Sequence, residues 1–398
     1  MHKHLPALLL CALAAGSPAL AQFKFAGKDI QVHGFIQQGF VKSTNNNFLT
    51  MNTRDGSFSM TDGGFNVSSR LTPKLRVGAQ AFSRNIGELS NGQVVLDWAF
   101  ADYKFNDWFG IRGGKVKTQL GLFTDTQDME FVHTWALLPQ SMYPIDQRAT
   151  TISHVGGDIY GEFQMKKAGK LAYVVYVGQR PDDKRGGYYL GTRDAYAPIS
   201  SYGSTVRGGD IRWHTPIDGL MAGYSHFDVN GGGDIKLVSS PVRPLPPSGI
   251  PGRFDLDKSA TNAFYADFQR GAFRTYAELW RTDQDIRLSF SPGTLSLQRY
   301  QAWYVAASYR VHKNVEIGSY YNNFAVDRRL DFSPTNGIRG PVVSARFDVN
   351  RYWNIKAETH FIDGYGTPIS SRTFYPSTNP NGFKPKTTVF LIRTGFAF

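Results

Sequence analysis

Two groups of charged side chains in this sequence could act together on charged solutes. The first is a set of acids in the stretch 119–149, namely Asp125, Asp128, Glu130 and Asp146. The second is a set of arginines that alternate with apolar residues in distant segments, namely Arg70, Arg76, Arg112 and Arg393. A basic wall facing an acidic segment across a narrow passage creates a field that orders dipolar solutes and weights the entry of ions. That chemistry requires a fold that joins segments separated by most of the chain.

Metal or hydrolytic chemistry has weaker support. Seven histidines follow residue 21, and none shows the H-x-H or H-E-x-x-H spacing of a metal site. His154 with Asp158, or His360 with Glu358, could be placed as base and acid, but such short spacings arise by chance along a strand. The stretch 113–118 does not fit a phosphate-binding loop, because Phe109 stands in place of the first glycine and Val116 follows Lys115 where Ser or Thr is required. We expect no metal and no cofactor, and an enzyme stays an alternative.

The composition indicates a folded protein rich in β-structure. The chain has 398 residues, of which 19% are charged and 14% are aromatic, too many aromatics for a disordered chain. Its 41 glycines and 20 prolines are spread along the sequence, which favours short strands and turns over long helices. The net charge is +12, but no Lys/Arg run is concentrated enough for nucleic acid, so no nucleic-acid partner is expected.

The first 21 residues predict a secretory signal. A basic start is followed by a short apolar run and by Ala19-Leu20-Ala21, and the run is too short to span a bilayer as a helix. Cleavage after Ala21 removes Lys3 and the only cysteine, Cys11, which leaves 43 basic against 32 acidic residues, a charge of +11. The expected division is therefore a signal at 1–21 and one β-barrel domain at 22–398.

Alternation of apolar and polar residues predicts sixteen strands that close into a barrel. In the last run, Phe390, Ile392 and Phe396 share one parity, while Arg393 and Gly395 share the other. Stretches of about ten residues with this pattern are the signature of transmembrane barrels, in which all backbone groups are paired. The predicted strands are 30–41, 62–71, 74–85, 93–105, 109–118, 150–165, 170–180, 204–215, 219–230, 260–270, 273–287, 296–310, 314–328, 338–350, 354–366 and 386–398.

Short turns and long loops alternate between these strands. Such an asymmetry is typical of outer-membrane barrels with short periplasmic turns and long extracellular loops. Parity also predicts further inward charges, namely Asp158, Glu162, Asp210, Arg212, Asp267, Arg274, Glu278, Arg346, Asp348, Lys356 and Glu358. These are mixed in sign, and many are expected to pair with one another as scaffolding of the wall.

With these features the sequence resembles the Gram-negative outer-membrane porins. The residues that carry the resemblance are the signal, the terminal Phe398, and the passage from Arg112 through Gly121-Leu122-Phe123 to Leu137-Leu138-Pro139. That passage is similar to the strand and third loop of porin-like channels related to phosphate-selective and dicarboxylate-type porins. The resemblance implies a homotrimer in contact with outer-membrane lipid and lipopolysaccharide, and passive diffusion of small hydrophilic solutes.

The stretch 119–149, here called loop three, is expected to fold into the barrel. A sixteen-stranded barrel encloses a lumen too wide for side chains alone to fill. Loop three is much less polar than the other loops, and Phe131, Trp135 and Leu138 predict a short helix over 132–138. A loop lying against the membrane or against another subunit is the alternative.

The sequence therefore predicts an all-β protein, an antiparallel transmembrane β-barrel of about sixteen strands with an inward-folded third loop. The expected function is a passive outer-membrane channel for small, anionic solutes. The alternatives are a solute-specific channel with a binding track that includes Tyr265, Tyr300 and Tyr304, a barrel enzyme, or an adhesin.

Overall fold

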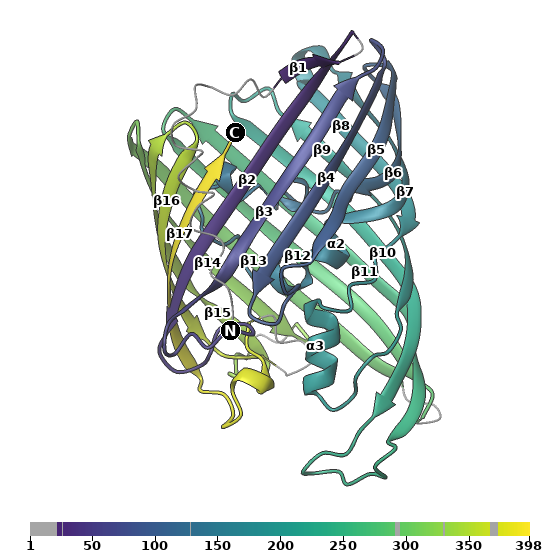
Figure 1. Cartoon of the computed structure of the whole chain (residues 1–398). Helices are drawn as coiled ribbons and strands as arrows, with labels where there is room; N and C mark the ends of the chain where they lie inside the picture. The colour runs from purple at the N-terminus through teal and green to yellow at the C-terminus, as the bar shows by residue number, and fades with distance from the viewer. Residues whose placement is uncertain (1–21, 26, 128, 291–294, 329–330, 367–372) are drawn as a thin grey trace.

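The computed structural model describes residues 22–398 except 26, 128, 291–294, 329–330 and 367–372. The predicted signal at 1–21 and Asp128 lie outside the described residues. In the part that is described, sixteen antiparallel strands form one closed barrel, in which each strand pairs with the next and β17 pairs with β2 (Figure 1). The prediction of a sixteen-stranded antiparallel barrel is confirmed.

Apart from β10 and β11, the barrel strands begin and end within a few residues of the predicted bounds. They are β2 (Lys28–Ser43), β3 (Ser57–Arg70), β4 (Leu75–Ile86), β5 (Val94–Asn106), β6 (Phe109–Lys117), β7 (Ser153–Gln164), β8 (Lys170–Gln179), β9 (Gly203–His214), β10 (Leu220–Leu237), β11 (Ile250–Arg270), β12 (Phe273–Leu288), β13 (Leu295–His312), β14 (Val315–Val326), β15 (Gly337–Asn350), β16 (Trp353–Asp363) and β17 (Lys386–Ala397).

Short helices lie in the loops. The α-helices are α2 (Arg148–Thr151) and α3 (Gly187–Asp194), and the 3-10 helices are η1 (Thr124–Thr126), η2 (Glu130–Val132), η3 (Ile145–Gln147), η4 (Lys166–Ala168) and η5 (Pro376–Thr378). Among the described residues, none of these helices is long and apolar enough to cross a bilayer. The helix expected over 132–138 is absent from that stretch, where only the end of η2 is helical.

The two ends of the barrel differ. Figure 1 shows β1 (Gln22–Phe25) and the C-terminus at one end, and α3 with the long β10–β11 hairpin at the other. Strand β1 pairs with the first residues of β2, from Gln22↔Gln31 to Phe25↔Lys28, beyond the point where β17 stops at Ala397↔Phe35. It thus extends the sheet where the last strand is too short. We call these the short-turn end and the long-loop end.

The hairpin of β10 and β11 is longer than predicted. The pattern predicted strands at 219–230 and 260–270, yet the pairing continues to Leu237↔Ile250. The glycines at 231–233 hide the alternation, and a bulge between Val229 and Gly231 shifts the register there. Beyond the bulge, Phe254 packs with Tyr202 at a ring distance of 5.7 Å, which gives the extension an apolar contact.

The two faces of the wall separate as the alternation predicts. On β16 and β17, Phe361 and Ile392 point outward with 47% and 41% of their surface exposed, while Glu358 and Arg393 point inward and are buried. Outward apolar residues continue around the barrel, including Phe65, Ile111, Ile159, Val175, Phe264, Val305 and Val343. The outer wall is therefore an apolar band, and the charges lie inside.

The C-terminal residue closes the ring against a glycine. The backbone of Phe398 exchanges two hydrogen bonds with Gly34, at 3.2 and 2.9 Å. A Cβ added to Gly34 would come within 2.7 Å of the Phe398 ring.

We expect Gly34→Ala to lower the free energy of unfolding by about 1–3 kcal/mol, because the added methyl group overpacks the contact between Gly34 and Phe398. Urea titration followed by the heat-modifiable gel shift measures it. Gly203→Ala is the control, because no heavy atom lies within 4 Å of its added Cβ. Equal midpoints for both variants would contradict the seam contact.

Candidate functional site: the loop inside the barrel

Loop three lies inside the barrel and crosses from one wall to the other. At its start, Gly121 N donates to Ser225 Oγ on β10 at 2.8 Å. In its middle, Ala136 O accepts from Arg393 on β17 at 3.0 Å. Near its end, Ile145 O accepts from Arg84 on β4 at 2.9 Å. The expectation of an inward-folded third loop is confirmed.

Two buried wall carboxylates hold the backbone of loop three. Glu358 on β16 accepts from Ala136 N at 2.9 Å and from Leu137 N at 3.2 Å. Glu278 on β12 accepts from Leu122 N at 3.1 Å. These amides would otherwise face the interior without an acceptor, which is costly for a buried N–H. The same bonds explain why 132–138 is not helical: the amides of Ala136 and Leu137 are committed to the wall instead of to carbonyls one turn back.

The carboxylate of Glu278 also gathers aromatic hydroxyls. Tyr143 of loop three donates to it at 2.6 Å, and Tyr304 on β13 donates to it as well. Trp280 Nε1 adds a third donor at 3.2 Å. A charged acceptor with several donors makes strong hydrogen bonds in a dry interior, so this cluster fixes loop three against β12 and β13.

A row of charged residues on adjacent strands receives the middle of loop three. Direct cross-strand pairs run from Arg310 to Glu316, then to Arg346, Lys356 and Arg393. Three cations in succession would repel one another, and loop three supplies their partners. Arg346 donates to His133 O at 2.9 Å, Lys356 donates to Glu130 O at 2.6 Å, and Arg393 pairs with the Glu130 carboxylate at 2.6 Å. Loop three thus gives each of the three cations an acceptor, and the carboxylate of Glu130 offsets one positive charge.

Burial shifts the titration of the loop residues at this row. Desolvation raises the pKa of Glu130 to about 7, although Arg393 and Lys356 oppose that shift. Desolvation also lowers the pKa of His133 to about 3, so this imidazole is neutral at ordinary pH. The charge of Glu130 therefore changes near neutral pH.

An aromatic core fills the space between loop three and the strands β11–β15. Trp135 contacts Tyr320 edge-on at 5.0 Å, and Phe123 contacts Tyr276 in the same manner at 5.2 Å. Of the tyrosines expected to form a binding track, Tyr265 and Tyr304 are 5% and 0% exposed, because loop three covers them, and only Tyr300 is partly exposed. The expected track is therefore not open to a solute at two of its three positions.

The end of loop three is bound to β4 and β5. Arg148 donates twice to Asp97, at 2.9 and 2.7 Å, and both side chains are buried. Asp97 sits at the point where the pairing of β4 and β5 shifts by one residue, between Gln80 and Ala81. Asp146 accepts from the hydroxyl of Tyr375 in the segment before β17. Both ends of loop three and its middle are thus anchored to different parts of the wall.

The predicted charged residues fall into separate places. Arg393 and Glu130 meet, Asp125 lies 3.6 Å from Arg212 on β9, and Asp146 is buried beside Tyr375. Arg70, Arg76 and Arg112 share another row, on β3, β4 and β6. Arg70 is eight residues from Asp62, the β3 partner of Arg393, a distance of about 27 Å along the strand. The four arginines stand on neighbouring strands of one stretch of the closed barrel, as their positions along the chain predict, but they lie at two different heights.

Parity marked several anchors as inward without showing their role. The expectation that many inward charges pair as wall scaffolding is confirmed by ion pairs such as Arg346–Asp348 at 2.7 Å and Arg274–Asp267 at 2.9 Å. Glu278, Glu358, Lys356 and Arg346 have a further role, because they also bind the backbone of loop three. Asp62 lies between Arg84 and Arg393, at 3.7 and 2.5 Å. Parity places its carboxylate inside, but no sequence signal identifies its partners.

The two histidine pairs have structural partners. His154 Nδ1 contacts Thr118 Oγ at 2.9 Å, while Asp158 accepts from Arg112 at 3.0 Å. His360 does contact Glu358 at 2.7 Å, but the same carboxylate holds loop three. The arrangement gives each histidine a role in holding the loop and its wall.

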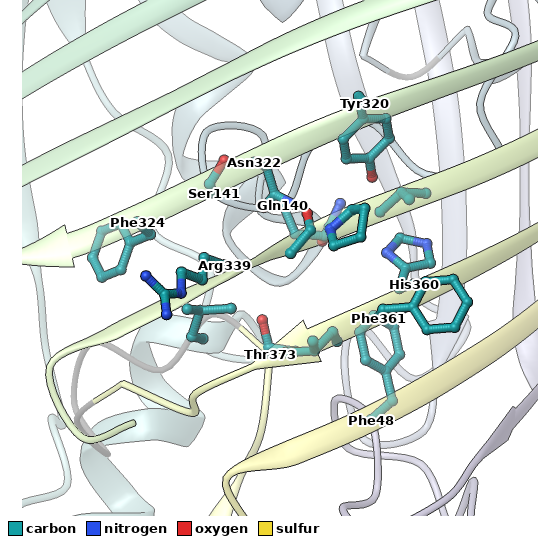
Figure 2. A pocket seen from close by; sticks show the side chains of 15 residues that line it. Phe48, Gln140, Ser141, Tyr320, Asn322, Phe324, Arg339, His360, Phe361 and Thr373 are labelled. Carbon is teal, nitrogen blue, oxygen red and sulfur yellow. Dashed lines mark hydrogen bonds between the residues drawn. The ribbon is translucent and has the colours of Figure 1, made fainter. Parts of the chain in front are cut away.

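A small pocket lies beside loop three, against β14–β16. Figure 2 shows Gln140 and Ser141 of loop three together with Asn322, His360 and Arg339 around it. Its volume of about 30 Å³ holds a water molecule or two, not an organic solute. Among the described residues, no group of His, Cys, Asp and Glu has the geometry of a metal site.

Comparisons with known proteins show the fold. No family model matches the chain, and no curated protein matches it. Among solved structures, the chain is similar to in-vitro folded OmpT, an outer membrane protein of Vibrio cholerae, with a TM-score of 0.61, 9% identity, and coverage of 95% of this chain and 99% of that one. It is also similar to the outer membrane channel DcaP of Acinetobacter baumannii, with a TM-score of 0.54, 10% identity, and coverage of 95% and 100%. The anion-selective porin from Comamonas acidovorans gives a TM-score of 0.55, 10% identity, and coverage of 93% and 100%.

Proposed function

We propose that the protein is a passive channel of the outer membrane for small hydrophilic, anionic solutes. The observation that carries the proposal is a closed barrel with an apolar outer band, a charged inner face, and a loop anchored across its lumen. The fold of the similar structures, which include a channel and an anion-selective porin, supports it. A signal at 1–21 would export the chain, and the apolar band would face outer-membrane lipid and lipopolysaccharide.

Loop three is the proposed constriction. Most inward side chains at its level are buried, so the free cross-section is small and we expect a low single-channel conductance. In the proposed channel, Glu130 with Arg393 and Asp125 with Arg212 lie at opposite walls of the narrow part, because β17 and β9 are eight strands apart in the closed barrel. Asp128 and Asp146 are the other acids of the proposed constriction. We assign Arg70, Arg76 and Arg112 to a separate basic row of the same lumen, nearer the short-turn end. This arrangement weights entry towards anions.

Neutralising part of this basic wall tests the selectivity. We expect the double variant Arg76→Gln/Arg112→Gln to lower the anion-to-cation permeability ratio by roughly threefold, because two cations are removed from the lumen. The reversal potential under a KCl gradient measures it. Arg253→Gln removes a cation of the β10–β11 extension and serves as the control. An unchanged reversal potential in the double variant would show that neither arginine contributes to the selectivity of the channel.

Planar-bilayer recording of the purified protein tests the function itself. A homotrimer of anion-preferring channels is expected to insert in events that each open three equal conductance steps. Under a KCl gradient, its reversal potential should lie toward the equilibrium potential of chloride. Conductance steps that come singly or in pairs would contradict the trimer. A reversal potential toward the equilibrium potential of potassium would contradict the anion preference. A correctly folded, heat-modifiable barrel that gives no steps would overturn the channel and favour an enzyme or an adhesin.

A further inference from the structure

A second row of charged residues crosses the inner wall away from the loop-three anchors. Direct cross-strand pairs join Arg70 to Arg76, Arg76 to Asp102, Asp102 to Arg112, and Arg112 to Asp158. The row covers β3 to β7. Because paired residues on neighbouring strands share one face of the sheet, and Asp158 is buried inside, the whole row faces the lumen.

The acids in this row already have donors. Asp158 accepts from Arg112 at 3.0 Å, and Asp102 accepts from the hydroxyl of Tyr160 at 2.5 Å. Arg70 and Arg76 stand directly opposite each other, an arrangement that destabilises a sheet unless an anion joins the pair. Within the described part of the chain, no carboxylate oxygen lies within 4.0 Å of either guanidinium. Both side chains are exposed.

The two arginines line a depression of about 290 Å³ near the short-turn end. Asp29, Gln31, Ser68 and Ser69 line the rest of it. With two guanidiniums and one carboxylate, the depression has a net charge of about +1, which matches a monoanion better than a dianion. Paired guanidiniums are suited to a carboxylate because their fork of N–H groups matches its two oxygens.

Aromatic faces adjoin the guanidiniums. Arg76 Cζ lies 5.5 Å from the ring centre of Phe100, which itself stacks on Trp98 at 5.5 Å and 27°. Gly78 stands opposite Phe100 on β4, and a Cβ there would come within 3.2 Å of Trp98. The glycine therefore leaves room for the rings to lie against the wall. The lining of the depression itself is polar, and Phe100 adjoins it at the Arg76 side, where its ring is half-buried.

We propose that this site binds a planar aromatic monocarboxylate, with its carboxylate on Arg70 and Arg76 and its ring against Phe100. The inference names a solute class and rests on the proposed channel function only for its role in transport. The binding itself is a property of the folded barrel. The site would hold such a solute at the short-turn end of the lumen before or after it passes loop three.

Calorimetric titration of the detergent-solubilised full-length protein tests the binding without any conduction. Benzoate is the aromatic probe, cyclohexanecarboxylate is the non-planar probe of similar size, and acetate is the probe without a ring. Benzoate is expected to bind tightest. The double variant Arg70→Gln/Arg76→Gln should weaken benzoate binding at least tenfold. Phe100→Leu should weaken the binding of benzoate and leave the binding of acetate unchanged. Arg351→Gln, in the β15–β16 turn, is the matched control and should change nothing.

Each result separates the site from the channel. Equal affinities for benzoate and cyclohexanecarboxylate, or a loss of acetate binding in Phe100→Leu, would overturn the aromatic class. Benzoate binding that survives Arg70→Gln/Arg76→Gln would overturn the site. A barrel that gives no conductance steps but binds benzoate through these arginines would contradict the channel and support the site. A conducting barrel with no such binding would contradict the site alone.

Discussion

Replacing Glu358 by alanine is expected to release the middle of loop three and to raise the single-channel conductance several-fold. The carboxylate accepts from the amides of Ala136 and Leu137, and it is 1% exposed, so water does not replace it easily. Two buried N–H groups left without an acceptor cost about 2–6 kcal/mol together. That cost multiplies the population of a displaced loop by a factor of about 30 or more. The strands keep their ladder bonds, so the barrel persists while its lumen widens.

Two measurements check this release. Bilayer recording gives the conductance, and limited proteolysis reports whether the segment around Ala136 has become accessible. Glu162→Ala is the control, because Glu162 is a wall carboxylate whose side chain is 47% exposed and forms an ion pair with Lys170 at 3.3 Å. Glu358→Gln keeps one acceptor oxygen and should give an intermediate effect. A Glu358→Ala barrel with ordinary conductance and intact protease resistance would show that the anchor is not needed to hold the loop.

Anion preference is expected to increase as the pH falls from about 8.5 to about 5.5. Burial raises the pKa of Glu130 to about 7, with Asp62 and Glu358 acting in the same direction and with Arg393 and Lys356 opposing it. Above that value the carboxylate is charged and offsets Arg393, with which it makes a 2.6 Å ion pair. Below it the group is neutral and the cation row on β15–β17 gains about one net positive charge. The permeability ratio should rise by about threefold.

The same group makes stability depend on pH in a defined direction. A carboxyl whose pKa is higher in the folded than in the unfolded chain binds more protons when folded. Its contribution is therefore complete below the ordinary value of 4.5 and is lost as the pH rises to about 7. Glu130→Gln should abolish both the change in selectivity and this part of the stability profile. The reversal potential at several pH values and urea midpoints measure them, and a pH response that persists in Glu130→Gln would assign it to another group.

The strands and the faces of the wall were predictable because their signal is local. Phe390, Ile392 and Arg393 alternate within a few residues, and a strand that separates lipid-like from polar surroundings must repeat this pattern every second residue. The interruption at Gly231–Gly233 shows the limit, since β10 continues through a bulge that the pattern does not mark. The inward fold of loop three followed from composition, because Phe131, Trp135 and Leu138 need apolar partners.

The partners of the loop were decided only by the tertiary structure. The amide of Ala136 meets Glu358, 222 residues away, and Arg393 meets Asp62 across the closing seam of the barrel. Parity says which wall residues point inward but not at which height a tilted strand brings each one, nor which of them loop three covers. That is why the four arginines separate into two rows, and why Tyr265 and Tyr304 are buried instead of lining a track. The alternation of residues determined the barrel, and the register of its strands with the path of loop three determined the site.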